Sequence, residues 1–245
     1  ESFRDLYDVQ VDIETKATRI DRSAMIVTAY HKPSDKEVTY PYDALILAQG
    51  GKPIVPPLPG ADKDHVFSLW TLQDMDRIDG FIEGREPRTA VVVGGGFIGL
   101  EMVEALRKRG IEVYVVERMP HIMPNMAPEI VGFLQSELEA YGVGIRTSRA
   151  VTEITDRTVQ LDDGSSLDAD MVLMSVGVKP TLDLAQNAGL TLGEAGGLLV
   201  DKYLRTSDEN IYGVGDMVEL EHKISGKKVR IPLAGPANRQ GRIAA

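Results

Sequence analysis

A glycine loop, Gly94-Gly95-Gly96-Phe97-Ile98-Gly99, lies between an apolar run and a helical pattern, and it limits the possible folds of this chain more than any other segment. The run before it, 90–93, is typical of a buried strand, and the helical pattern after it extends to residue 109. A second apolar run, 113–116, ends at Glu117. An acid at about 20 residues beyond such glycines completes a dinucleotide-binding βαβ unit. The segment therefore predicts an α/β domain with a parallel sheet.

Each position of this unit has its own task in that interpretation. Gly94 permits the tight turn, Gly96 lets the backbone approach a pyrophosphate, and Gly99 lets helix and strand pack closely. The helix N-terminus offers free N–H groups and a positive dipole end to the phosphates. Glu117 can accept both ribose hydroxyls and would repel a 2′-phosphate, so NADH is expected to be preferred over NADPH. The adjacent Arg118 could partly serve a 2′-phosphate, and the alternative to the whole interpretation is a glycine-rich turn without a ligand.

Composition excludes several classes of protein. The net charge is −10 over 245 residues, which argues against a nucleic-acid or anionic-membrane partner. No apolar run reaches the length of a membrane span. There is no cysteine, so disulfides and thiolate metal sites within the chain are excluded, and a cytoplasmic setting fits. The four histidines lack the spacing of metal ligands, so no metal site is expected.

The organisation along the chain indicates one domain inserted into another. The first part is β-rich and leads into a proline-rich connector at 53–59. We expect a nucleotide-binding domain at 61–181, inserted between two pieces of another domain at 1–60 and 182–245. The expected fold class is α/β.

Local patterns predict the elements. Strands are expected at 9–13, 25–30, 37–40, 44–48, 90–93, 112–116, 143–146, within 151–161, and at 170–176, 198–200 and 211–214. Helices are expected at 71–84, 97–109, 128–141, 182–188 and from 233 onward.

Five segments together resemble the pyridine nucleotide-disulfide oxidoreductase family, which is FAD-dependent. They are 42–50, 91–117, 175–180, 206–216 and 231–242. The last, Ile231-Pro232-Leu233-Ala234-Gly235-Pro236-Ala237-Asn238-Arg239-Gln240-Gly241-Arg242, is similar to the branch of coenzyme A-disulfide reductases, NADH oxidases, NADH peroxidases and persulfide reductases. The resemblance covers nearly the whole chain. It implies a partial FAD-binding domain at 1–60, an NADH-binding domain at 61–181 and the continued FAD-binding domain at 182–245. The implied architecture is a three-layer Rossmann-like NAD(P)-binding domain inserted in part of a second Rossmann-like FAD-binding domain.

The resemblance implies roles for individual residues. Val176, Gly177 and Val178 would lie against the nicotinamide half of NADH, with Gly95, Ile98 and Arg118 completing that site. FAD would contact Ala17, Ala48, Gln49, Gly50, Gly215, Asp216, Leu233 and Ala234, although the family usually has threonine where this chain has Gln49. Phe97 and Glu101 would act near the nicotinamide and flavin. Core packing is the alternative for Phe97, an exposed helix-start carboxylate for Glu101, a turn or N-cap aspartate for Asp216, and an ordinary loop before a helix for Leu233 and Ala234.

The chain begins with Glu1 and ends in a helix-like run, so we expect a segment of a longer protein. The family's first glycine motif, its redox cysteine and its dimerisation domain would lie outside it. The implied function is hydride transfer from NADH to FAD and on to coenzyme A disulfide or a persulfide through that cysteine, in a homodimer that could also bind coenzyme A. Three alternatives stay open: an oxidase or peroxidase acting on oxygen or peroxide, an NADH-dependent reductase of a ferredoxin-type carrier, and a non-catalytic NADH-sensing module.

Overall fold

The computed structural model describes residues 7–245, which divide into two compact units. The inserted unit is Lys52–Lys179, and the split unit combines the chain up to Gly51 with Pro180–Ala245. Composition placed the first boundary after residue 60, but contacts place it after Gly51. The reason is that the proline-rich connector packs on the inserted unit: Leu58 joins its core, and the Ile154 N–H donates to the Pro59 carbonyl at 2.9 Å.

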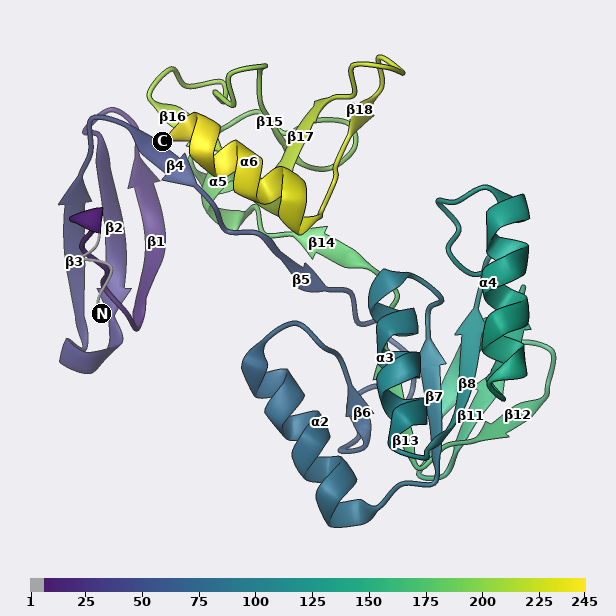
Figure 1. The fold of residues 1–245 in the computed structure, drawn as a ribbon. Helices are drawn as coiled ribbons and strands as arrows, with labels where there is room; N and C mark the ends of the chain where they lie inside the picture. The colour runs from purple at the N-terminus through teal and green to yellow at the C-terminus, as the bar shows by residue number, and fades with distance from the viewer. Residues whose placement is uncertain (1–6) are drawn as a thin grey trace. The chain divides into compact units, whose positions relative to one another are not determined.

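A parallel sheet forms the centre of the inserted unit, and Figure 1 shows its strands. Its order is β6 (Val66–Phe67), β13 (Met171–Met174), β7 (Thr89–Val93), β8 (Glu112–Glu117) and β9 (Gly144–Thr147). Every neighbouring pair in this sheet runs parallel. The carboxyl ends of these strands therefore share one edge, where open α/β sheets bind their ligands.

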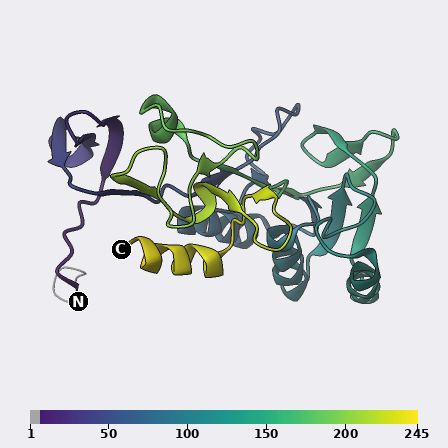
Figure 2. The ribbon, with the colours of Figure 1, turned by 90° about the horizontal axis from the view of Figure 1, so that it is seen from above.

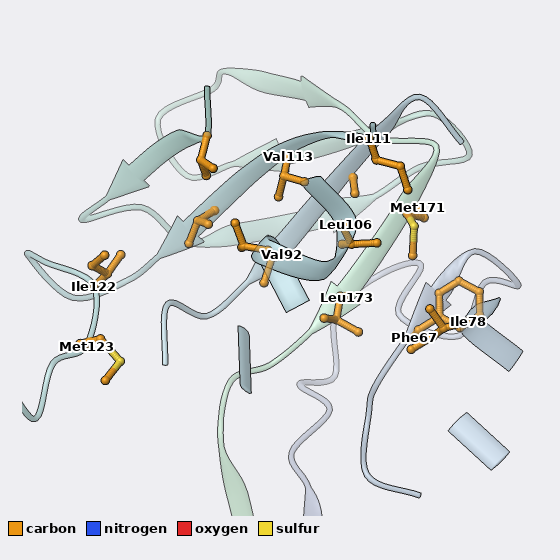
Figure 3. Packing of buried hydrophobic residues seen from close by; sticks show 14 of the residues in the cluster. Phe67, Ile78, Val92, Leu106, Ile111, Val113, Ile122, Met123, Met171 and Leu173 are labelled. Atoms are coloured by element: carbon orange, nitrogen blue, oxygen red, sulfur yellow. The ribbon is translucent and has the colours of Figure 1, made fainter. Parts of the chain in front are cut away.

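Helices cover one face of that sheet. They are α2 (Leu72–Arg85), α3 (Phe97–Lys108) and α4 (Pro128–Ala140). The cluster on this face includes Val92, Leu106 and Leu173, and Figure 3 shows these side chains together. Because strand residues alternate between faces, Val91 and Val93 belong to a separate cluster on the opposite face.

The opposite face is covered by an antiparallel sheet of three strands, β10 (Val151–Ile154), β11 (Thr158–Leu161) and β12 (Ser166–Asp168). Figure 2 shows this sheet and the helices α3 and α4 on opposite sides of the parallel sheet. The unit thus has three layers, as expected, but its third layer is a small sheet instead of helices. Burial of the parallel sheet on both faces explains its continuous apolar strands.

The split unit is built from shorter elements. An antiparallel sheet comprises β1 (Thr15–Asp21), β2 (Ile26–His31) and β3 (Lys36–Pro41), with η1 (Lys32–Ser34) between the last two. Strand β4 (Leu45–Leu47) pairs in parallel with β16 (Ile211–Gly213), and η2 (Gly215–Met217) follows β16 in the sequence. The remaining elements are β15 (Leu198–Leu199), β17 (Val218–Glu221), β18 (Lys228–Val229), α5 (Asp183–Asn187) and α6 (Ala234–Ala244). Two short strands, β5 (Gly51–Pro53) and β14 (Val178–Pro180), pair where the chain passes between the units.

One expected strand is wrong. Residues 9–13 form no strand, and Val9, Val11 and Ile13 are exposed, because no other strand among the described residues pairs with them. The run 44–48 does form β4. Its continuous apolar residues predict a strand covered on both faces, but Ile46 is 39% exposed, so one face of the strand is not fully covered. Among residues 7–245, no helix is both long enough and apolar enough to cross a bilayer.

Candidate functional site

A cleft of about 610 Å³ opens at the carboxyl edge of the parallel sheet, within the inserted unit. Its floor includes Val93, Gly94 and Gly96 from the end of β7, and Glu117 from the end of β8. Val176 and Gly177, which follow β13, line it as well. The tertiary structure thus brings together segments that lie far apart in the sequence.

Position 94 requires glycine for two reasons, its backbone conformation and the lack of space for a side chain. Its φ is +105°, a region that residues with a Cβ rarely adopt. A Cβ at this position would lie 2.3 Å from the carbonyl oxygen of Ser175. The Gly94 N–H donates to the Val116 carbonyl at 2.8 Å, so the turn is bound to the neighbouring strand. Gly94 therefore makes the tight turn that the motif predicted.

Gly99 and Gly95 allow close packing inside the loop. A Cβ on Gly99 would lie 2.2 Å from the Gly94 carbonyl oxygen, and one on Gly95 would lie 2.8 Å from the Ile122 Cγ2 atom. Gly96 differs, because a Cβ there would meet nothing within 4 Å. The open space above Gly96 is the space that a pyrophosphate would occupy if the backbone approaches it closely.

The first turn of α3 supplies donors to this space. Gly96 is the N-cap of α3 and provides no side-chain cap. Within residues 7–245, the N–H groups of Gly96, Phe97 and Ile98 have no hydrogen-bond partner. Free N–H groups and the positive end of the helix dipole together favour an anionic ligand. Gly95 is excluded from this set because its N–H donates to Glu117.

Glu117 has a structural role that its position in the motif did not indicate. It is buried, and its Oε2 accepts from the Gly95 N–H at 2.8 Å, while its Oε1 accepts from the Met119 N–H at 2.7 Å. The carboxylate therefore joins the glycine loop to the end of β8. Each oxygen keeps a further lone pair, so the residue can still accept the hydroxyls of a ribose.

The opposite wall of the cleft begins at Gly177, whose φ is +113°. The Gly177 carbonyl accepts from the Ile54 N–H at 2.9 Å, which draws the connector against this wall. Ile54, Pro56 and Leu58 also line the cleft. Val178 begins β14 and does not line it. The apolar wall suits the flat, weakly polar ring of a nicotinamide.

Phe97 and Glu101 lie elsewhere. Neither of these residues lines the cleft of the glycine loop, and Ile98 does not line it either. Phe97 and Glu101 face a second cleft of about 870 Å³ between α3 and α4, whose apolar lining includes Leu100 and Met123. The Phe97 side chain is 55% exposed, so within this unit it is not a core residue.

Several residues that line the first cleft were missed by the sequence reasoning. They are Met119, Pro124, Asn125, Arg149, Ala150 and Val151, beside the expected Arg118. Arg149 follows β9, and its backbone N–H donates to the Glu117 carbonyl at 3.1 Å. No local motif marks it. The signal that could have found it is topological, since β9 is the next parallel strand and its carboxyl end shares the edge with Glu117.

The expected FAD residues lie in the split unit, mostly at two neighbouring strand ends. Ala48, Gln49 and Gly50 follow β4, and Gly215 and Asp216 follow β16, its parallel partner. The Val214 N–H donates to the Leu47 carbonyl at 3.0 Å, which joins the two ends. The Asp216 carboxylate makes no hydrogen bond with residues 7–245. A carboxylate left unpaired at such an edge suits a polyol ligand.

The middle of α6 packs beside the end of β16, where a Cβ on Gly215 would lie 3.8 Å from the Ala237 Cβ. The Gly215 N–H donates to the Gln240 side chain on α6 at 2.7 Å, and Leu233 is the N-cap of that helix, with Ala234 as its first residue. The Gln49 Oε1 atom is buried without a partner among the described residues, which is what a missing donor would leave behind. Ala17 lies apart, in β1, where it packs against the apolar core of the unit.

Both sites thus contain the groups that their proposed cofactors need. The inserted unit offers a glycine loop with space for a pyrophosphate, free N–H groups and a ribose acceptor. The split unit offers an unpaired carboxylate and an orphaned amide oxygen at one edge. The assignment of individual contacts to NADH and FAD stays a prediction.

Comparisons with known proteins give one consistent result. The model of the pyridine nucleotide-disulphide oxidoreductase family matches residues 4–241. The NADH oxidase of Methanocaldococcus jannaschii is 34% identical over all of this chain and 55% of its own length. The crystal structure of reduced Bacillus anthracis CoADR-RHD superposes with a TM-score of 0.96 at 36% identity, covering 99% of this chain and 44% of that one. The NAD-dependent persulfide reductase from A. fulgidus has a TM-score of 0.95 at 37% identity, covering 99% of this chain and 45% of its own.

The chain spans about half the length of these relatives. The family match extends over both units and both candidate sites. The chain belongs to the pyridine nucleotide-disulphide oxidoreductase family.

Proposed function

We propose that this chain is the NADH-binding part, and some of the FAD-binding part, of an oxidoreductase that passes electrons from NADH through FAD to a disulfide-type acceptor. The observation that carries the proposal is the cleft at the carboxyl edge of the parallel sheet. In it Gly96 faces open space, and the Glu117 carboxylate lies beside the glycine loop, bonded to the Gly95 N–H. Its shape and donors suit a dinucleotide.

The residues of the inserted unit bind and orient the nucleotide in this proposal. The N–H groups of Gly96, Phe97 and Ile98 hold the pyrophosphate. The remaining lone pairs of Glu117 accept the ribose hydroxyls and disfavour a 2′-phosphate, so NADH is preferred over NADPH. Val176 and Gly177 place the nicotinamide against the apolar wall. Arg118 is exposed at the rim, where it reduces the negative charge that Glu117 presents.

The residues of the split unit hold the flavin. Asp216 accepts a ribityl hydroxyl, and Ala48, Gln49 and Gly50 contact the cofactor from the neighbouring strand end. At the start of α6, Leu233 and Ala234 lie against the electron-rich edge of the ring in this proposal. The Ala234 N–H is the donor, because the Leu233 N–H already donates to the Ile231 carbonyl at 2.8 Å. When bound, the two cofactors supply the chemistry, a hydride passing from nicotinamide to flavin.

We further propose a coenzyme A disulfide or a persulfide as the final acceptor, reached through a cysteine outside this chain. The segment 231–242 and the names of the two structural relatives support that acceptor. The chain itself holds no cysteine and so no thiolate for the exchange. A cytoplasmic homodimer that binds coenzyme A is part of the same proposal.

Oxygen or peroxide is the second candidate acceptor. The relative from Methanocaldococcus jannaschii, an NADH oxidase, favours it. The cofactor sites would be unchanged, because the two proposals differ only in the group that takes electrons from the flavin.

Anaerobic NADH consumption by the full-length protein tests the proposal. We expect bleaching of the flavin absorbance on addition of NADH, and sustained consumption only when coenzyme A disulfide or a persulfide is present. Consumption that resumes only with oxygen or peroxide would select the second candidate. A protein that retains no flavin, or whose flavin is not reduced by NADH, would contradict both.

A further inference from the structure

A second arginine lies at the adenosine end of the dinucleotide cleft. Arg149 lines the cleft together with Glu117 and Arg118. The charged residues that line the cleft are thus one glutamate and two arginines, and in the proposed binding mode they lie where NADH and NADPH differ. Their formal charges alone would predict a site that favours binding of a 2′-phosphate. That prediction conflicts with the role proposed for Glu117, which is to disfavour a 2′-phosphate.

The backbone of Arg149 is fixed by neighbouring bonds. The Arg149 N–H donates to the Glu117 carbonyl at 3.1 Å, and the Ser148 N–H donates to the Met119 carbonyl at 2.9 Å. Ser148 has a φ of +52°, a left-handed conformation that turns the chain toward the cleft. The start of the Arg149 side chain therefore has a fixed position relative to Glu117.

The guanidinium group is held by the turn between β11 and β12. Its Nε donates to the Asp163 Oδ2 at 2.6 Å, and its Nη1 donates to the Ser148 carbonyl at 2.7 Å. The other oxygen of Asp163, Oδ1, accepts from the N–H and the hydroxyl of Ser165, at 3.0 and 2.6 Å. These bonds leave Asp163 oriented with one oxygen toward Arg149.

Asp163 remains charged over the whole physiological range. The hydroxyl and then the N–H of Ser165, followed by Arg149, lower the pKa of its carboxyl to about 2. The charge of Arg149 is therefore always offset by a partner. Arg118 has no such partner among residues 7–245. The four groups together carry no net charge, although a count of the cleft residues alone gives one positive charge.

We propose that Arg149 is a specificity-determining residue of the dinucleotide cleft, and that Asp163 limits the affinity for NADPH by holding and neutralising its guanidinium group. The inference rests on the proposed function, because it assigns the adenosine half of NADH to this end of the cleft. The ligand class that the cleft favours is a dinucleotide whose 2′-hydroxyl is free. A surface ion pair of this kind contributes little to stability, so its effect should appear in binding and not in folding.

The test compares Asp163→Asn with Asp162→Asn in the full-length protein. The amide of Asp163→Asn can keep the bonds to Ser165 through its oxygen, but its NH₂ group faces the Arg149 Nε and cannot accept from it. Asp162→Asn removes the same charge from the same turn, and the Asp162 side chain has no bond to Arg149. Binding of NAD⁺ and NADP⁺ is measured by calorimetry, because the oxidised forms do not reduce the flavin.

We expect Asp163→Asn to tighten NADP⁺ binding by roughly three- to tenfold relative to Asp162→Asn, with NAD⁺ binding unchanged within about twofold. The gain should shrink as salt is raised, because these groups are partly exposed. Arg149→Gln should shift the ratio the other way, since it leaves Asp163 as an unpaired negative charge.

Equal effects of the two aspartate variants on NADP⁺ would overturn the inference, because they would reflect total charge alone. An unchanged ratio in Arg149→Gln would overturn it as well. Both outcomes leave NAD⁺ binding by the wild-type protein intact. A wild-type protein that binds neither dinucleotide would instead overturn the proposed function, and the inference with it.

Discussion

Glu117 is the residue whose replacement tests the site most directly, because it is expected to support both the ligand and the fold. In Glu117→Gln one carboxylate oxygen becomes an NH₂ group. In the wild-type protein the N–H groups of Gly95 and Met119 lie 2.8 and 2.7 Å from the two carboxylate oxygens. Whichever way the amide of the variant is oriented, its NH₂ donor faces one of these two N–H groups. In one orientation the buried N–H of Gly95 loses its acceptor, and in the other the N–H of Met119 loses it, although Met119 is 43% exposed.

The expected loss comes from that geometry. Leaving a buried N–H unsatisfied costs about 1–3 kcal/mol. A loss of about 1 kcal/mol is expected here, because the amide can keep the Gly95 bond and leave the more exposed Met119 N–H to water. The unfolding midpoint should then fall by roughly 2–4 °C in the absence of any nucleotide. NADH binding should weaken by about tenfold or more, since a charge-assisted bond to the ribose is also lost.

The assay is thermal unfolding of the full-length protein without nucleotide, followed by NAD⁺ titration. Glu153→Gln is the matched control, because Glu153 is an exposed carboxylate on β10 of the same unit. It should change the midpoint by less than about 1 °C. If Glu117→Gln unfolds at the same temperature as Glu153→Gln, the carboxylate does not join the loop to β8 and the reasoning is wrong.

Two further predictions concern the glycine loop and a helix start. Gly94→Ala should destabilise the protein by more than about 2 kcal/mol, because of its φ of +105° and the contact with Ser175, whereas Gly96→Ala should leave the unfolding midpoint unchanged and weaken NAD⁺ binding severalfold. Equal midpoints for these two variants would contradict the distinction. Thr71→Ala should cost about 1 kcal/mol in denaturant unfolding, because the Thr71 hydroxyl accepts from the Asp74 N–H in a capping box at the start of α2. Thr71→Ser should keep most of the wild-type stability, because its hydroxyl can accept the same bond. If Thr71→Ser is destabilised as much as Thr71→Ala, the capping role is refuted.

The βαβ unit was predictable because its signals are local. The expected strands at 90–93 and 112–116 and the helix at 97–109 appear as β7, β8 and α3, with bounds that differ by one residue. Each follows from side-chain periodicity or from the steric freedom of glycine, and both act between near neighbours. The tight turn expected at Gly94 is present for the same reason, because it depends on the conformational freedom of that one residue.

Long-range pairing explains what the patterns did not reveal. The run 9–13 alternates like a strand but finds no partner in residues 7–245, and a strand without a partner leaves its backbone groups unpaired. The proline-rich segment has the composition of a free connector, yet it packs on the inserted unit through Leu58. Phe97 lies within the glycine motif but faces another cleft, because the start of a helix directs successive side chains to different sides.

Local sequence was enough to predict the nucleotide-binding unit, the acid that ends its second strand and the family to which the chain belongs. Tertiary contacts were needed to show that Glu117 joins the glycine loop to β8, that a small sheet covers the second face, and that Arg149 and Asp163 meet beside the cleft. The difference lies in the range of the interactions. Turn sterics and periodicity are properties of a few adjacent residues, whereas the charge and lining of a cleft depend on which strand ends the folded sheet places side by side.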